Sequence, residues 1–287
     1  MLRSTLVLTL ALAAAIAASP AAPAPAVTVT ARSLQPGEVV VLTVETGDPA
    51  TAVQARAFDR DWTPFRRDPL TWQLLLGIDL DVKPGTYQVA IDIDRPAGSE
   101  RLTHPVVVSA KQFPTRRLTV DSAYVDPPPD VQARIVEEAR LLASIWTDSA
   151  PEPLWTGAFV RPVPHEANSA FGTRSVFNGQ ARSPHGGADF RSPARTPVAA
   201  PNAGRVVLAR DLYYTGGTVA IDHGLGLVSL FAHLSRIDVA AGDAVTSRQV
   251  VGLVGATGRV TGPHLHWTLR LGGTRVDPLS LLAVLGI

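Results

Sequence analysis

Residues 262–271, Gly262-Pro263-His264-Leu265-His266-Trp267-Thr268-Leu269-Arg270-Leu271, alternate between apolar and other side chains from position 264 onward. Successive side chains of a β-strand point to opposite faces of its sheet. The odd-numbered positions 265–271 are all apolar, which predicts a strand that packs this face on a core. Both imidazoles, at His264 and His266, then project side by side from the other face. One of them could bind a metal ion while its neighbour handles protons.

A second segment, Ser183-Pro184-His185-Gly186-Gly187-Ala188-Asp189-Phe190, places a histidine and a carboxylate four residues apart. Pro184 and two glycines disfavour a helix here, so we expect a loop that enters a strand. Catalytic zinc sites use three nitrogen or oxygen ligands and keep a fourth position for water. His185, Asp189 and one histidine of the later pair match this requirement. The other histidine of the pair is then available for acid–base chemistry.

These motifs and three further segments resemble the lysostaphin-like, LytM-type zinc endopeptidases, which cut peptide bonds in bacterial peptidoglycan. The further segments are Ser169-Ala170-Phe171-Gly172-Thr173-Arg174, Phe231-Ala232-His233-Leu234-Ser235 and Gly255-Ala256-Thr257-Gly258-Arg259-Val260-Thr261-Gly262-Pro263-His264-Leu265-His266. The resemblance covers roughly residues 155–283. It implies that His185, Asp189 and His266 bind a Zn²⁺ ion, and that His233 and His264 are catalytic histidines that do not bind the metal.

The sequence contains no HExxH motif, which supplies the glutamate base in helix-borne zinc proteases. Histidine must then serve as the base. Our hypothesis is that His264 accepts a proton from zinc-activated water and passes it to the leaving amine, while His233 orients the water or stabilises the oxyanion. The sequence allows these two roles to be exchanged. Arg174 fits a contact with a substrate carboxylate as well as it fits closure of its own loop.

Four features depart from the family pattern, of which one, the run Ala188-Asp189-Phe190-Arg191, has no clear chemical consequence. Phe231 stands where tyrosine is common, which removes a hydroxyl near the expected site, and Thr268 stands where many members have glutamate. Arg248 occupies a turn position that is usually glycine. Because arginine tolerates a positive φ poorly, we expect the shape of that hairpin to differ.

Other residues with potential side-chain chemistry lack motif support. His104 and His165 belong to none of the segments above, and His223 lies between Asp222 and a glycine, so we expect it in a turn or at the surface. Asn178-Gly179 predicts a tight turn without a catalytic role.

The chain has 287 residues, of which 46% are hydrophobic and 18% charged, which suits a packed core and more than one domain. Its 26 basic and 25 acidic residues give a net charge of +1. This balance provides no electrostatic footprint for nucleic acid and no basic run that would hold the chain on anionic lipid.

The first 26 residues have the form of a secretory signal and an Ala/Pro-rich junction, with Arg3, an apolar run from Leu6 to Ala18 and small residues after it. We expect cleavage after Ala17 or Ala18 and export to the periplasm, the cell envelope or the medium. The apolar run has 13 residues, fewer than the ~20 that span a bilayer, so the mature protein should lack a stable membrane span. The chain has no cysteine, which excludes disulfides and a lipoprotein anchor.

Residues 27–112 contain short β-branched or alternating runs separated by turn signals, which predicts an immunoglobulin-like β-sandwich. These runs are 27–30, 39–44, 86–93 and 106–108. A linker over 113–154 follows, stiffened by Pro127-Pro128-Pro129. Asp130 can cap a helix over 130–146, which we expect to pack between the two domains.

Residues 155–287 return to a β pattern and should form the antiparallel β peptidase domain that the resemblance implies, so the chain is mostly β overall. The expected strands are 205–210, 217–222, 227–234, 250–254 and 264–271. Within 227–233, alternation places Ser229, Phe231 and His233 on one face, from which His233 could join the site.

The resemblance implies an exported zinc endopeptidase that hydrolyses the stem-peptide cross-links of peptidoglycan. A competing hypothesis is a non-enzymatic wall-binding regulator that activates other wall hydrolases, because some relatives have lost their metal residues. The intact set of five residues argues against this alternative. A zinc protease that acts on glycine-rich proteins outside the wall shares the same site. The N-terminal module could be inhibitory, targeting or structural.

Overall fold

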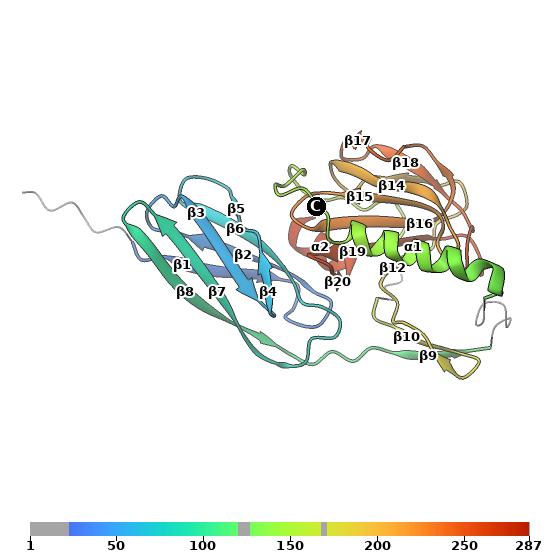
Figure 1. The fold of residues 1–287 in the computed structure, drawn as a ribbon, viewed down its shortest axis with the longest axis horizontal. Coiled ribbons are helices and arrows are strands. Elements are labelled where there is room, and N and C mark those ends of the chain that lie inside the picture. The colour runs from blue at the N-terminus through green and yellow to red at the C-terminus, as the bar shows by residue number, and fades with distance from the viewer. Residues whose placement is uncertain (1–22, 120–126, 168–170, 287) are drawn as a thin grey trace, which may run out of the picture.

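The computed structural model describes residues 23–119, 127–167 and 171–286 (Figure 1). Residues 1–22 of the expected signal and junction (1–26) lie outside the described residues, as do Ser169-Ala170 of the expected opening turn. Within the described ranges, no helix is long and apolar enough to cross a membrane.

The N-terminal half is a β-sandwich of two four-stranded sheets, as expected, with strand orders β1-β2-β6-β5 and β4-β3-β7-β8. Alternation along the longer strands builds its core, since Val89, Ile91 and Ile93 of β7 are all fully buried. The strands are β1 (Ala26–Ala31), β2 (Val39–Glu45), β3 (Ala52–Ala57), β4 (Arg60–Trp62), β5 (Phe65–Arg66), β6 (Thr71–Gly77), β7 (Gly85–Arg95) and β8 (Gly98–Val108).

The C-terminal half is built on one nine-stranded sheet, with the central order β12-β19-β16-β15-β14-β17. Its strands are β12 (Gly187–Phe190), β13 (Pro197–Ala199), β14 (Gly204–Leu212), β15 (Gly216–Asp222), β16 (Leu227–Ile237), β17 (Ala244–Val245), β18 (Val250–Val254), β19 (Leu265–Leu271) and β20 (Thr274–Val276). The odd-numbered side chains of β19, from Leu265 to Leu271, are completely buried, which confirms the predicted alternation. Helix α2 (Pro278–Leu285) ends the described chain.

The linker contributes a strand to a small sheet beside the larger one. Strand β9 (Thr115–Leu118) pairs with β10 (Arg174–Phe177), which pairs with β11 (Gln180–Ala181). The β9–β10 pair is parallel, unlike the antiparallel pairs expected for this half. Asn178 and Gly179 join β10 to β11 with φ values of 49° and 83°, which confirms the tight turn.

The linker helix begins with a 3₁₀ turn, η2 (Pro129–Val131), and continues as α1 (Gln132–Ile145). Asp130 lies inside the 3₁₀ turn, and no side chain caps the first turn of α1, so the expected cap is wrong. The expected position between the domains is also wrong. Helix α1 lies against the C-terminal sheet (Figure 1). Ile145 packs there with Leu208 and Val228, because that face presents apolar side chains of β14, β15 and β16.

Ion pairs join the two halves of the molecule. The guanidinium of Arg32 bonds the buried carboxylate of Glu38 at 2.7 Å and that of Asp277, beside α2, at 2.8 Å. Lys111, just before β9, bonds the same Glu38 at 3.0 Å. The start of the linker is therefore held at the junction of the two halves.

Arg248 adopts a left-handed backbone conformation in the turn before β18. Arg248 adopts a φ of 68°, and its N–H donates to the carbonyl of Ala200 at 2.9 Å. The bond to Ala200 helps to hold Arg248 in the left-handed region, which non-glycine residues seldom adopt.

Candidate metal centre

Strands β12 and β19 bring the two sequence motifs together. In their antiparallel register, Asp189 lies directly opposite His266. His185 lies in the loop before β12, where its N–H donates to the carbonyl of Thr173 at 2.9 Å and its carbonyl accepts from Gly172 at 2.7 Å. A strand pair between segments 77 residues apart thus assembles the site.

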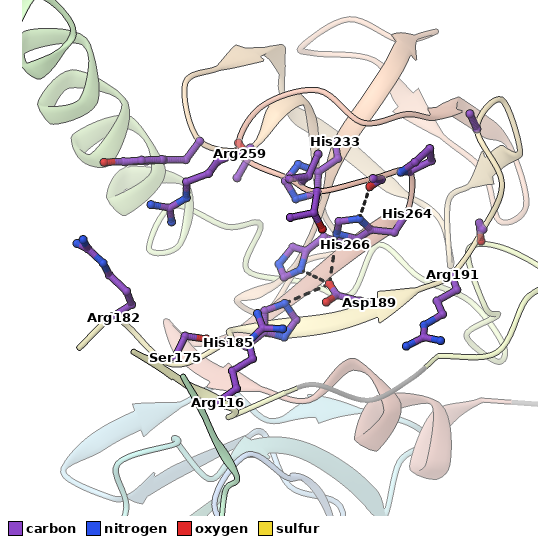
Figure 2. Close-up of a pocket in the computed structure, with 18 of the residues that line it drawn as sticks. Arg116, Ser175, Arg182, His185, Asp189, Arg191, His233, Arg259, His264 and His266 are labelled. Carbon is purple, nitrogen blue, oxygen red and sulfur yellow. Dashed lines mark hydrogen bonds and ion pairs between the residues drawn. The ribbon is translucent and has the colours of Figure 1, made fainter. Parts of the chain in front are cut away.

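His185, Asp189 and His266 present one potential ligand atom each, and these atoms all lie within 4.8 Å of one another. Oδ1 of Asp189 is 2.9 Å from Nδ1 of His266 and 3.1 Å from Nε2 of His185 (Figure 2). A tetrahedral zinc ion with bonds of about 2.1 Å spaces its ligands about 3.4 Å apart. Two nitrogens and one oxygen already close to that spacing fit a zinc ion.

The protonation states of these groups also suit a metal. Burial opposes the ionisation of Asp189, but hydrogen bonds from His185 and His266 outweigh it and hold the pKa of the carboxyl well below its usual range. Burial lowers the pKa of His266. An ionised carboxylate and a neutral imidazole are the forms that bind metal ions.

Thr268 contacts the far side of the His266 ring. Its hydroxyl oxygen lies 2.8 Å from Nε2 of His266, so it occupies the position from which an outer partner orients a metal-binding histidine. When Nδ1 of His266 binds a metal, Nε2 carries the proton and donates to this hydroxyl. Gly187, opposite Thr268, leaves room for the ring, because a Cβ there would lie 2.9 Å from Cε1 of His266.

His264 faces the metal centre as a proton acceptor. Its Nδ1 lies 2.9 Å from the carbonyl of Gly262. A carbonyl only accepts, so Nδ1 carries the proton and Nε2 of the neutral ring is unprotonated. Nε2 lies 3.8 Å from Oδ1 of Asp189, at the edge of the candidate metal centre.

His233 reaches the same site through a β-bulge. Ser229 and Phe231 are completely buried in the core beneath the sheet. Beyond them the register to β15 shifts, His233 has a φ of 66°, and Leu234 packs in the core in its place. The expected shared face of Ser229, Phe231 and His233 is therefore wrong. His233 nevertheless lies beside His264, with 4.9 Å between ring centroids.

His233 is also a neutral proton acceptor. Its Nδ1 lies 2.9 Å from the carbonyl of Thr257, which only accepts, so Nε2 lacks a proton. Burial and the nearby charge of His266 lower the pKa of His233 to about 4. At neutral pH, Nε2 can orient a water molecule or accept a proton from it, but it cannot donate to an oxyanion.

Two sequence expectations are corrected by the structure. His223 lies in the connection between β15 and β16, as one alternative expected, but it is not at the surface. His223 is completely buried, where it donates from Nδ1 to the carbonyl of Ala203 at 2.8 Å and accepts at Nε2 from the Ser229 hydroxyl at 3.0 Å. Two satisfied ring nitrogens allow this burial. Phe231 faces the core against Trp267, so a hydroxyl at this position would not face the metal centre.

The candidate metal centre opens into a cavity of about 860 Å³. All five motif residues line it, whereas Arg174, His104 and His165 do not. The sequence patterns did not predict that arginine side chains line this cavity. The four arginines that line the cavity are Arg116, Arg182, Arg191 and Arg259.

The sequence profile of peptidase family M23 matches residues 183–278. The peptidoglycan DD-endopeptidase ShyA of Vibrio cholerae is 44% identical over 98 residues, which are 34% of this chain and 23% of ShyA. The DD-carboxypeptidase/endopeptidase Mpg of Neisseria meningitidis is 41% identical over 97 residues, or 34% of this chain and 22% of Mpg. The chain thus matches less than a quarter of the length of these curated relatives.

One solved structure is similar to this chain over almost the whole length of both proteins. The crystal structure of a presumed M23 peptidase from Pseudomonas aeruginosa is 31% identical and superposes with a TM-score of 0.69. The similarity covers 89% of this chain and 97% of the other, so it includes the N-terminal half as well as the metal centre.

Proposed function

The chain belongs to peptidase family M23, and we propose that it is a zinc-dependent endopeptidase that hydrolyses the stem-peptide cross-links of bacterial peptidoglycan. The observation that carries this proposal is the convergence of three potential metal ligands with two further histidines in one cavity. The similarity to ShyA, a peptidoglycan DD-endopeptidase, supports the choice of substrate.

His185, Asp189 and His266 would hold the zinc ion. When bound there, zinc supplies a Lewis acid that polarises a carbonyl and lowers the pKa of water from 15.7 to about 7. Thr268 keeps the His266 ring in the orientation that presents Nδ1.

His264 is the proposed general base, because its unprotonated Nε2 faces the metal centre. It accepts a proton from the attacking water and donates it to the leaving amine when the peptide bond breaks. His233 presents a second unprotonated Nε2 and orients the same water. Because Nε2 of His233 lacks a proton, His233 is better suited to orient the water than to stabilise the oxyanion that forms when the water attacks.

The substrate places the proposed activity outside the cytoplasm. We infer that the apolar segment near the N-terminus, Leu6 to Ala18, directs export. The mature enzyme then acts in the periplasm or the cell envelope, with peptidoglycan stem peptides as its partners.

The test is a digestion of purified, cross-linked peptidoglycan, with the zinc content measured alongside and the fragments identified by mass. Wild type should remove cross-linked dimers. His264→Ala should keep zinc and lose about 10²- to 10⁴-fold in turnover, whereas His185→Ala should lose both zinc and turnover. A zinc-loaded wild type that cleaves no cross-link would refute the proposal, and a protein that binds no zinc would favour the wall-binding regulator.

A further inference from the structure

The cavity over the candidate metal centre is strongly cationic. Four arginines line it, and Asp189 is the sole carboxylate among the described lining residues. The chain as a whole is nearly balanced, with a net charge of +1. Like charges gathered in a concave site attract ligands of the opposite sign. The cavity therefore suits a ligand that carries negative charge.

The arginines lie on both sides of the metal centre. Figure 2 shows Arg182 and Arg259 on one side of Asp189 and Arg191 on the other. The guanidinium of Arg259 is 4.3 Å from the centroid of the Tyr214 ring, an arrangement that favours a fixed position. A bound peptide would meet cationic groups on either side of its cleaved bond.

Arg116 comes from outside the segment that matches the family. It lies on β9 of the linker, in parallel register with Ser175 of β10, and its Nε donates to the Ser175 hydroxyl at 3.0 Å. This bond engages only Nε, and the side chain lines the same cavity as the metal centre (Figure 2). The linker thus supplies a cation to the proposed active site.

Local packing holds β9 in place. The N–H of Arg174 donates to the carbonyl of Pro114 at 2.9 Å, and the ring of Phe113 lies 6.3 Å from that of Phe171. Gly172 has a φ of 74°, and a Cβ there would lie 2.1 Å from Phe113. Because the glycine lets Phe113 approach so closely, the segment that leads into β9 is packed against the loop before β10.

We propose that Arg116 is a specificity residue, and that this cavity selects peptides with a free carboxylate near the cleaved bond. The inference rests on the proposed peptidase function and narrows its substrate class. A guanidinium binds a carboxylate through two parallel hydrogen bonds, which neither an amide nor a neutral glycine peptide can match.

The test uses two synthetic cross-linked stem peptides, one with free carboxylates and one with the same carboxylates amidated. Arg116→Gln should raise KM for the acidic peptide about tenfold, as expected for a hydrogen bond to a charged group, with little change in kcat. KM for the amidated peptide should not change. Arg116→Lys should recover part of the loss, because it restores the charge without the bidentate geometry.

Arg117→Gln is the matched control. Arg117 is the next residue on the same strand and is exposed, but it does not line the cavity. This variant removes the same charge from the chain and should cleave both peptides as wild type does. Thermal unfolding of both glutamine variants checks that β9 remains packed.

Equal effects of Arg116→Gln on the two peptides, or equal effects of the two glutamine variants, would overturn the inference. If zinc-loaded wild type cleaves neither peptide, the proposed function fails separately. In that case, calorimetry of the two peptides tests whether the cavity binds the acidic peptide more tightly than the amidated one. A wild type that binds both peptides equally would contradict it, and weaker binding of the acidic peptide by Arg116→Gln alone would support it.

Discussion

Thr268→Val removes one hydroxyl group and leaves the shape of the side chain almost unchanged. The lost group is the partner of His266 Nε2 at 2.8 Å. Valine is also β-branched and suits a strand, so β19 should keep its register. The change therefore isolates the contact that orients a proposed zinc ligand.

The magnitude follows from that single contact. Loss of a neutral hydrogen bond that leaves a buried partner unsatisfied costs about 1–2 kcal/mol, which is roughly five- to thirtyfold in a dissociation constant. Loss of an outer partner of a metal ligand typically costs about 10- to 100-fold in affinity. We expect zinc to bind Thr268→Val about 10- to 30-fold more weakly than wild type.

Competition with a chelator of known zinc affinity measures this change. Thr268→Ser should restore most of the affinity, because serine keeps the hydroxyl. Metal-free Thr268→Ser should unfold at nearly the wild-type denaturant concentration. Metal-free Thr268→Val should unfold at a somewhat lower one, because Nε2 of His266 loses the same partner there. A Thr268→Val protein that binds zinc within twofold of wild type would refute the reasoning, and so would a Thr268→Ser protein that binds as weakly as the valine variant.

Two further predictions concern stability. Burial lowers the pKa of His223 from 6.5 to about 4, so the unfolded chain binds a proton that the fold excludes, and stability should fall as the pH drops from about 6.5 toward 4. Between pH 7 and 4.5, denaturant titration should show a loss about 2–3 kcal/mol larger for wild type than for His223→Gln, whereas parallel pH profiles would contradict this. Gly172→Ala should destabilise the protein by about 1–3 kcal/mol more than Gly179→Ala, because both glycines have a positive φ but only Gly172 lies against Phe113. Equal losses in urea titrations would show that this packing contributes nothing.

Much of the candidate site could be predicted from local patterns. The alternation from Leu265 to Leu271 predicted that His266 lies on the face away from the core. In the structure, His266 pairs with Asp189 of the neighbouring strand β12. Motif resemblance named His233 and His264, and the structure brings both into the same cavity. These predictions worked because strand alternation depends only on backbone geometry over a few residues.

Apart from the local cap expected at Asp130, the predictions that were wrong depended on distant segments. The parity of 227–233 could not indicate a bulge at His233, because a bulge arises from the register between two strands. The burial of His223 in its turn depends on Ala203 and Ser229, whose carbonyl and hydroxyl satisfy its ring nitrogens. Helix α1 packs on the C-terminal sheet because that face is apolar, which its own residues do not reveal.

The mostly β class follows from the sequence alone, because short-range periodicity reveals the strands. The expected ligands His185, Asp189 and His266 also follow from the sequence, through the motifs that carry the family resemblance. Only the tertiary structure decided that His233 joins the site, that Thr268 contacts His266, and that the linker strand brings Arg116 to the cavity. Each of these outcomes depends on which segments pair. That choice is made by burial and hydrogen bonding over the whole chain, and no local pattern contains it.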